Sequence, residues 1–575
     1  MDKRTLSNRP NQDAHTDTLV SAGVHPLLAR LWAARGVVSP TETDTSWQRL
    51  QPPTTLTHSR LAAAALADAI QAGKRLLIVA DYDCDGATAC AVGLRALRAM
   101  GAQVDFIVPD RFATGYGLSP EVVELAANHE AGRPDLLLTV DNGIASVEGV
   151  EAARRLGMEV IITDHHLPGN ELPQALAIVN PNQPECGFAS KHLAGVGVIY
   201  YLMMSLRAEL RQRGIYPANG GPRLDALADL VALGTVADVV TLDANNRILV
   251  AQGLARIRAG RMQPGIRALF AVASREPARA SSADLGFMLG PRINAAGRLA
   301  DMGIGIHCLT TDDETQALAL ARQLDEINQQ RRQIEARMRD EAFASIESAD
   351  QQIGATVTVY HPDWHQGVVG LVASRLKETY WRPTIAFAPD GDDYLRGSGR
   401  SIPDVHMRDA LDLVSKRCPQ AIAKFGGHAM AAGLTLHKQA YDLFLTAFDE
   451  AVQELTGQKE FQAVIETDGS LETGYANAEV ARLLQTQIWG AGFPAPVFRD
   501  HFEVVHQRLL KDRHLKLVLR RGHQQFDAIW FNHANLLPTQ IEAAYRLDLN
   551  VWNGRVSAQL LIEHASAADG SRHGS

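Results

Sequence analysis

The stretch Ile78-Val79-Ala80-Asp81-Tyr82-Asp83-Cys84-Asp85-Gly86 decides how the fold of this chain is interpreted. An apolar run, residues 76–80, ends here in three aspartates at alternate positions. Residues 136–141 and 160–164 have the same shape, an apolar run that ends in an aspartate. Helical patterns lie between these runs, and this alternation is typical of a parallel sheet covered by helices on both faces. Because ligands gather at the carboxyl ends of parallel strands, the sequence predicts a functional site where these aspartates meet.

The composition is that of an ordinary globular protein with several domains. A chain of 575 residues is too long for one hydrophobic core, and 46% of its residues are hydrophobic. The first 20 residues lack the apolar core of a signal peptide, and the longest apolar stretch, 193–206, is too short to span a bilayer. Five cysteines without a CxxC pair indicate a reduced, cytoplasmic protein. The net charge of −9 means that any DNA-binding charge must be concentrated locally.

Patterning along the chain predicts an α/β protein with a β-barrel at its end. Residues 312–350 contain no Gly or Pro and predict one long connecting helix. Short alternating segments such as Leu515 to Arg520 predict a small barrel. The expected parts are an N-terminal extension (1–60), a parallel-sheet catalytic domain (61–311), the connecting helix (312–350), a second α/β domain (351–457), the barrel (458–565) and a disordered tail (566–575).

Four acidic motifs carry the candidate chemistry. The loop from Asp81 to Asp85 resembles the start of an EF-hand, but the later glutamate of such a loop is absent, which favours Mg²⁺ or Mn²⁺ over Ca²⁺. The others are Asp141-Asn142-Gly143, Asp164-His165-His166 and Gly234 to Asp238. Each alone has an ordinary explanation in turns or helix caps. Their joint occurrence, which we expect at successive strand ends, favours bound cations that offset the acidic charge.

In order and spacing, these motifs (DxDxDG, DNG, DHH and GTxAD) resemble those of the DHH phosphoesterase family. The resemblance implies two Mn²⁺ or Mg²⁺ ions and metal-assisted hydrolysis of a phosphodiester bond. It implies that Asp83 binds one ion, that Asp85, His165 and Asp238 bind the other, and that Asp141 bridges the pair. Asp81 and His166 would support these ligands. The candidate catalytic residues are therefore Asp81, Asp83, Asp85, Asp141, His165, His166 and Asp238.

Other features resemble the single-strand-specific DNA exonucleases of that family. Val79 stands where small members often carry histidine, and Phe425-Gly426-Gly427-His428 resembles the signature of the DHH-associated second domain. The resemblance implies digestion from the 5′ end in DNA repair and recombination, with Arg298, Ser398 and Arg400 at the terminal phosphate. Residues 365–370 predict a phosphate-binding turn before a helix, and 397–401 predict a flexible loop. Further candidate substrate-binding residues are Arg111, Tyr116, Arg292, Asn294, Arg375, Gly399, Gly427 and His428.

The barrel is expected to be an OB-fold that binds nucleic acid. Lys516 and Arg520 would lie on one face of their strand, opposite the leucines. Phe526, Trp530 and Trp552 are candidates for base stacking, although the two tryptophans fit the barrel core better.

The expected partner is single-stranded DNA, with a single-strand-binding protein and a helicase as suppliers, and without a membrane or a small-molecule cofactor. We expect a monomer. Two alternatives stay open: an enzyme for short oligoribonucleotides, nucleotide phosphates or cyclic dinucleotides, and an inactive scaffold. The barrel and Val79 argue against the first, and the complete set of carboxylates argues against the second.

Overall fold

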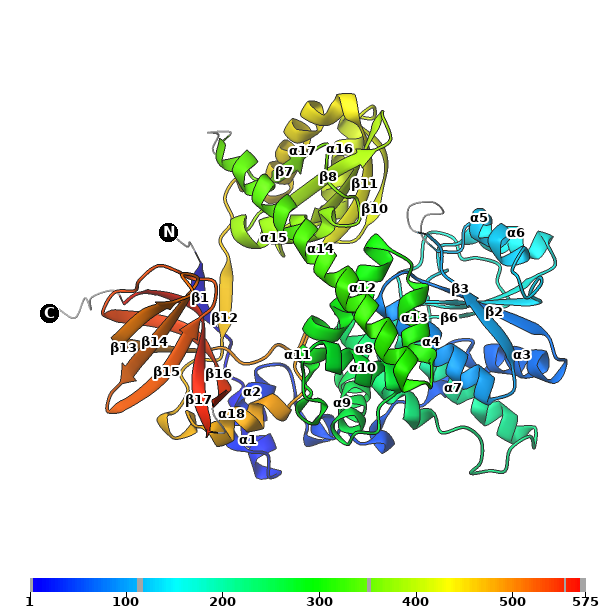
Figure 1. Ribbon diagram of the computed structural model, residues 1–575, viewed down its shortest axis with the longest axis horizontal. Helices are drawn as coiled ribbons and strands as arrows, with labels where there is room; N and C mark the ends of the chain where they lie inside the picture. Colours follow the sequence, from blue (N-terminus) through cyan, green and yellow to red (C-terminus); the bar gives the residue numbers. More distant parts are fainter. Residues whose placement is uncertain (1–3, 111–116, 349–352, 553–554, 569–575) are drawn as a thin grey trace. The chain divides into compact units, whose positions relative to one another are not determined.

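The computed structural model describes residues 4–110, 117–348, 353–552 and 555–568 (Figure 1). The chain forms two compact units. Of the described residues, the smaller contains 4–5, 298–300 and 326–465, and the larger contains 6–297, 301–325 and those from 466 onward. In the described part of the chain, no helix is both long and apolar enough to cross a membrane.

A five-stranded parallel sheet organises the larger unit. Its strands, in spatial order, are β3 (Gln103–Ile107), β2 (Arg75–Ala80), β4 (Leu136–Val140), β5 (Glu159–Thr163) and β6 (Ala177–Val179). Alternate residues of each strand enter two different hydrophobic clusters, so helices cover both faces. The predicted parallel sheet is confirmed, and Asp81, Asp141 and Asp164 each directly follow a strand.

Helices of the larger unit hold the sheet and the acidic motifs in place. Those that join the core on the first face are α3 (Ser59–Gln71), α4 (Cys84–Ala99), α7 (Gly195–Gln212) and α8 (Ala228–Ala237), and those on the second are α5 (Pro120–Ala127) and α6 (Val147–Arg155). The segments that follow are α9 (Ala244–Arg258), α10 (Pro264–Val272), α11 (Ser282–Asp284), a π-helical turn η6 (Leu285–Leu289), α12 (Gly290–Leu299) and α13 (Gly303–Thr310).

One expected strand end is wrong. Asp238 caps the C-terminus of helix α8, so the fourth acidic motif reaches the site from a helix. Residues 228–235 are all buried, and a run that is apolar on every side has the same appearance in a buried strand and in a buried helix.

The smaller unit contains a mixed five-stranded sheet. In spatial order its strands are β10 (Ile422–Gly427), β11 (Ala431–His437), β9 (Tyr394–Arg400), β8 (Thr384–Asp390) and β7 (Val357–Tyr360), of which β7 and β8 are parallel. Its helices are α15 (Val369–Tyr380), α16 (Met407–Arg417) and α17 (Tyr441–Thr456). The predicted long helix is present as α14 (Glu314–Ser348), with residues in both units.

The expected flexible loop at 397–401 is wrong, because residues up to Arg400 belong to β9, which pairs with strands on both sides. The glycines that suggested a loop serve packing instead. A β-carbon at Gly397 would lie 2.4 Å from the ring of Phe387, and one at Gly399 would lie 3.1 Å from the sulfur of Met407. Glycine within a strand commonly marks such a close approach.

The last part of the larger unit is a closed barrel, as predicted. Its strands run in the order β13 (Phe498–Leu510), β14 (His514–Arg521), β15 (Gln524–Trp530), β17 (Arg555–Ala567) and β16 (Gln540–Trp552), and α18 (Ala478–Thr486) precedes them. Leu515, Leu517 and Leu519 are buried in the barrel, as their alternation predicted. Phe526 is also buried there, so it does not offer a ring face for base stacking.

Residues near the N-terminus, for which the sequence carries no clear signal, pack with the barrel. The strand β1 (Thr5–Asn8) pairs with β12 (Val464–Thr467), and helices α1 (Asp13–Ser21) and α2 (Pro26–Ala33) follow. Leu27, Leu28 and Leu31 of α2 join the barrel core. Arg35 forms a buried ion pair of 2.7 Å with Asp468.

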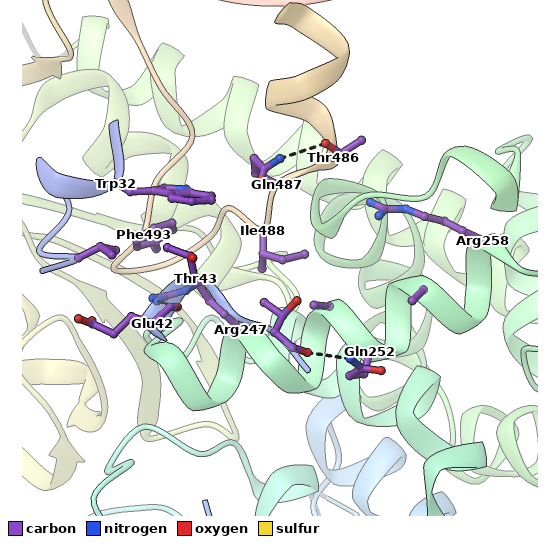
Figure 2. Close-up of a pocket in the computed structure, with 14 residues that line it drawn as sticks. Trp32, Glu42, Thr43, Arg247, Gln252, Arg258, Thr486, Gln487, Ile488 and Phe493 are labelled. Atoms are coloured by element: carbon purple, nitrogen blue, oxygen red, sulfur yellow. Dashed lines mark hydrogen bonds between the residues drawn. The ribbon is translucent and has the colours of Figure 1, made fainter. Parts of the chain in front are cut away.

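A pocket of about 290 Å³ lies between α9, residues 32–45 and residues 486–493 (Figure 2). Arg247 lines the pocket, and its guanidinium lies 4.4 Å from the centre of the Phe493 ring. It donates hydrogen bonds to the carbonyl oxygens of Leu242 and Glu42. None of the predicted metal ligands is among the described residues that line this pocket.

Packing of α12 against the acidic loop generates a stability prediction. A β-carbon at Gly297 would lie 1.9 Å from the carbonyl oxygen of Tyr82. We expect Gly297→Ala to lower the free energy of unfolding by about 1–3 kcal/mol, measured by urea denaturation, because the backbone must shift. Gly474→Ala is the control, because nothing lies within 4 Å of its added carbon. Equal stability of both variants would contradict this packing.

Candidate metal centre

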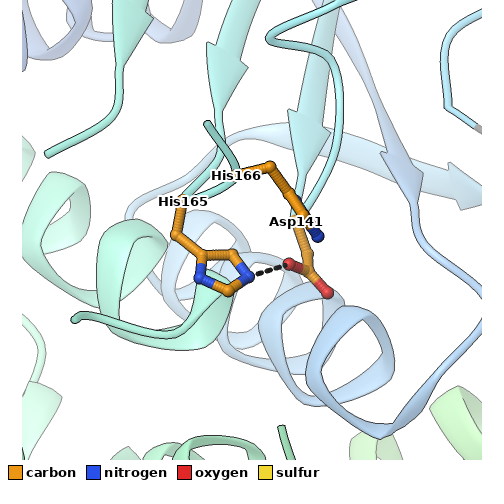
Figure 3. A group of neighbouring side chains, drawn as sticks. All are labelled: Asp141, His165 and His166. Atoms are coloured by element: carbon orange, nitrogen blue, oxygen red, sulfur yellow. Dashed lines mark ion pairs between the residues drawn. The ribbon is translucent and has the colours of Figure 1, made fainter. Parts of the chain in front are cut away.

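All seven predicted catalytic residues converge at the carboxyl edge of the parallel sheet. The side chains form three groups, and within each group the ligand atoms lie no more than 4.8 Å apart. The groups are Asp81 with Asp83 and Asp141, Asp85 with His165 and Asp238, and Asp141 with His165 and His166. Figure 3 shows the third group, in which His165 Nε2 lies 3.1 Å from Asp141 Oδ1. His165 Nε2 also lies 3.5 Å from Asp238 Oδ2. Asp141 and His165 therefore link the groups into one cluster.

Asp141, which belongs to two of the three ligand groups, has an unusual backbone conformation. Its φ angle is +63°, in the left-handed region, which aspartate tolerates better than most residues. The N-terminus of α7 approaches it closely, since a β-carbon at Gly195 would lie 2.5 Å from that of Asp141. Glycine at position 195 is thus required for this approach.

The same helix end holds Asp85. The backbone N–H groups of Gly195 and Val196 donate to its two carboxylate oxygens, at 2.6 and 2.8 Å. These bonds favour the charged form, yet burial and the charge of Asp83 raise the pKa of Asp85 to about 7. Repulsion and desolvation at this position therefore outweigh the helix N-terminus.

Other carboxyls of the cluster are destabilised in their charged form in the same way. Burial, followed by the charges of their acidic neighbours, raises the pKa of Asp81, Asp141 and Asp238 well above the usual value. A cation would remove the repulsion, and carboxylate oxygens with an imidazole nitrogen suit Mn²⁺, while an oxygen-only group suits Mg²⁺ as well. The residues present fit divalent ions.

Sequence reasoning missed Asp164 as a functional residue. Its carboxylate accepts the backbone N–H groups of Ile144, His165 and His166, and it lies 2.7 Å from His166 Nδ1. Burial lowers the pKa of His166, but the hydrogen bond and charge of Asp164 raise it to about 9. The signal was available, because Asp164 ends a strand as Asp81 and Asp141 do.

Two asparagines that the sequence did not single out fix the backbone of the histidine pair. Asn180 Nδ2 donates to the carbonyl oxygen of His166, and Asn182 Nδ2 donates to that of His165. No local pattern distinguishes such asparagines from ordinary turn residues.

Two candidate substrate-binding residues on α12 contact the protein itself. Asn294 Oδ1 accepts the backbone N–H of Cys84, which fixes the acidic loop. Arg292 lies 2.8 Å from Asp325. These contacts hold both side chains within the protein, and their contact with substrate stays a prediction.

In the smaller unit, candidate phosphate-binding residues gather where β9 adjoins the start of α15. Arg400 donates to Ser398 Oγ at 3.0 Å, and a β-carbon at Gly370 would lie 2.9 Å from both side chains. Arg298 donates to the carbonyl oxygen of Gly367 at 3.0 Å. We call this set, Arg298, Gly367, Gly370, Ser398 and Arg400, the arginine cradle.

The remaining candidates of this unit differ in their surroundings. Gly399 and Gly427 flank Ala432 on the two neighbouring strands, and the backbone N–H of His428 donates to Ala431. Arg375 instead pairs with Glu335 at 3.1 Å and with Glu378 at 3.2 Å.

On the barrel, Lys516 and Arg520 point outward as predicted, but both have acidic neighbours. Lys516 lies 3.4 Å from Asp527, and Arg520 lies 2.6 Å from Glu503. Trp530 is partly buried and stacks on His533 at 3.6 Å. Arg111, Tyr116 and the Trp552 side chain lie outside the described residues.

Family models match three parts of the chain. They are the DHH family N-terminal domain at residues 75–235, the DHHA1 domain at 352–454 and the RecJ OB domain at 467–564.

Whole-chain similarity agrees with these matches. The chain is 47% identical to the single-stranded-DNA-specific exonuclease RecJ of Escherichia coli, over 94% of this chain and 96% of that protein. Crystal structures of RecJ from Thermus thermophilus, in complex with Mn²⁺ and with Mg²⁺, are similar with TM-scores of 0.80 and 0.76 and identities of 29% and 28%. Each covers 98% of this chain, which covers 79% and 78% of theirs. With its DHH, DHHA1 and OB domains in this order, the chain belongs to the RecJ family of the DHH phosphoesterases.

Proposed function

We propose that this protein is a divalent-metal-dependent exonuclease that degrades single-stranded DNA from the 5′ end during DNA repair and recombination. The observation that carries the proposal is the cluster of carboxylates and histidines around Asp141, in a chain of the RecJ family. The substrate and the metals are those named for the relatives. The direction of digestion, from the 5′ end, follows from the resemblance to their family.

Two ions, Mn²⁺ or Mg²⁺, are assigned to the linked ligand groups. Asp81 and Asp83 would hold one, Asp85, His165 and Asp238 the other, and Asp141 both. When bound, such ions activate water and stabilise negative charge on the attacked phosphate. Asp81, first expected only as a supporting residue, is assigned as a ligand because its carboxylate lies in the same group as that of Asp83.

The protein's own groups position this chemistry. Asp164 lies 2.7 Å from His166 Nδ1 and raises the pKa of His166, which favours a positive charge beside the acidic cluster. The α7 N-terminus fixes Asp85, and Asn294 fixes the loop that carries Asp83. Removing such supporting groups typically costs roughly 10–100-fold in metal affinity or activity.

The arginine cradle is assigned to the 5′-terminal phosphate. Its guanidinium groups and hydroxyl match an anion with several acceptor oxygens, and the start of α15 adds backbone N–H groups. The OB barrel is assigned to the sugar-phosphate backbone of the DNA strand. The boundaries between the parts of the chain are proposed from the sequence, after residues 60, 311, 350, 457 and 565. A single-strand-binding protein and a helicase are proposed as suppliers of substrate to a cytoplasmic monomer.

Removal of the bridging ligand tests the metal assignment. We expect Asp141→Ala, and wild type with EDTA, to lose at least about 100-fold of nuclease activity, since supporting groups alone are worth nearly that much. The assay follows shortening of a 3′-labelled single strand with Mn²⁺, beside a blunt duplex and RNA. Asp105→Ala, an exposed aspartate of the same sheet, is the control.

Other outcomes of this assay separate the alternatives. Cleavage of dinucleotides in preference to long strands would favour a small-nucleotide phosphoesterase. DNA binding without hydrolysis at any Mn²⁺ or Mg²⁺ concentration would favour an inactive scaffold.

Metal affinity should depend on pH around neutrality. Asp85 has a pKa of about 7 in the metal-free protein, so below this pH an incoming cation must displace its proton. Apparent Mn²⁺ affinity is expected to fall as the pH drops from 8 to about 6, with proton release on binding. Titration calorimetry in two buffers of different ionisation enthalpy measures both. A constant affinity over this range would contradict the shared burial of these carboxyls.

The arginine cradle predicts a preference at the strand end. Arg400→Ala should reduce the advantage of a 5′-phosphorylated strand over a 5′-hydroxyl strand by roughly 10-fold or more, because a charged hydrogen bond is lost. Arg396→Ala, on the same face of β9 but paired with Asp390, should leave this ratio unchanged. If both variants keep the wild-type ratio, the cradle does not bind the terminal phosphate.

A further inference from the structure

Two large apolar side chains in the segments around the end of α8 are exposed to solvent. Val239 directly follows Asp238 and is 70% exposed, and Phe287 of the turn η6 is 75% exposed. Leu285 and Leu289 of the same turn are fully buried, so η6 as a whole is not a solvent loop. Phe287 therefore stands out from a well-packed element.

The two side chains belong to adjoining segments. A β-carbon at Gly286 would lie 3.1 Å from Val236 Cγ1, and one at Gly290 would lie 3.1 Å from Ala237 Cβ. The turn η6 thus rests on the last turn of α8, which ends at the predicted metal ligand Asp238. Val239 is therefore the residue next to a predicted metal ligand, and Phe287 belongs to the turn that packs against the helix end carrying that ligand.

Both segments have backbone conformations that need a reason. Val239 has a φ angle of +64°, a left-handed conformation that a β-branched residue rarely adopts. The turn η6 is π-helical, and such turns occur frequently at functional sites. A single exposed apolar residue needs no explanation, but here two of them coincide with two unusual backbone conformations beside a metal centre.

Charge limits what can bind there. Carboxylates crowd the edge of the sheet beside these two side chains, so an apolar surface there suits the uncharged parts of a strand better than its phosphates. The uncharged parts of a nucleic acid strand are its bases and sugars. An aromatic ring can stack on any base, whereas both faces of a paired base are covered by its neighbours in a duplex.

We propose that Phe287 and Val239 form a contact surface for unpaired bases of the strand that enters the metal centre, with Phe287 stacking on a base and Val239 packing beside it. This inference rests on the proposed nuclease function and adds to it a physical basis for selecting single strands. The surface is independent of the base sequence, because every base has a π face.

Strand binding by matched variants tests this surface. We expect Phe287→Ala to weaken binding of a labelled oligothymidylate, and to raise its KM, by roughly 10-fold, since one stacked base is lost. Phe287→Trp should restore both. Leu156→Ala is the control, because Leu156 is 38% exposed but precedes β5, at the opposite edge of the sheet. Binding is measured by fluorescence anisotropy with Ca²⁺ in place of Mn²⁺.

A second pair of measurements separates a base contact from a general defect. A strand with abasic nucleotides near its 5′ end should bind wild type and Phe287→Ala equally, because the stacking partner is absent. Val239→Asn should weaken strand binding without lowering the melting temperature, since asparagine tolerates the left-handed conformation.

The outcomes distinguish this inference from the nuclease proposal. If wild type binds the strand without cleaving it and Phe287→Ala binds more weakly, the contact surface stands and the nuclease function fails. If wild type cleaves and Phe287→Ala binds equally well, the surface is wrong and the nuclease function stands. An equal loss for normal and abasic strands would overturn base stacking, and a wild type that binds no strand would overturn both.

Discussion

Repulsion among buried carboxylates is the constraint on which the catalytic part of this protein depends. The sheet, the α7 N-terminus and the end of α8 deliver acidic side chains to one small volume, where burial raises their pKa values. A fold keeps such a cluster only when something offsets the cost, and divalent cations do so most directly. Gly195 and the left-handed Asp141 follow from the same demand, because they allow the groups to approach.

Much of this arrangement could be predicted from the sequence, because strand ends are local features. An apolar run followed by aspartate specifies both the sheet and the edge at which Asp81 and Asp141 meet. Asp238 was placed on the wrong element, because the buried helix α8 lacks the periodicity of an exposed one. Asn180 and Asn182 could not be found at all, since their bonds to the histidine backbone arise from tertiary folding.

In the smaller unit, the sequence-based prediction took a strand for a flexible loop. Glycines at 397 and 399 were interpreted as chain flexibility, whereas the structure uses them to admit Phe387 and Met407 against a central strand. Ser398 and Arg400 therefore project from a rigid sheet, and their spacing is fixed by the strand repeat. A rigid base for phosphate-binding groups is better than a loop, because less side-chain and backbone freedom is lost on binding.

Packing of the N-terminal residues with the barrel has a consequence for how the chain is made. Arg35 and its partner Asp468 are separated by 433 residues, and the core of the barrel includes leucines of α2. At about 5–20 residues per second, a ribosome takes roughly 20–90 seconds to supply the second partner after the first. During that interval α2 exposes Leu27, Leu28 and Leu31 without their native neighbours. The core of the barrel therefore stays incomplete until Leu560 and Ile562 of β17 have been synthesised, so its closure is a late event in the making of this chain.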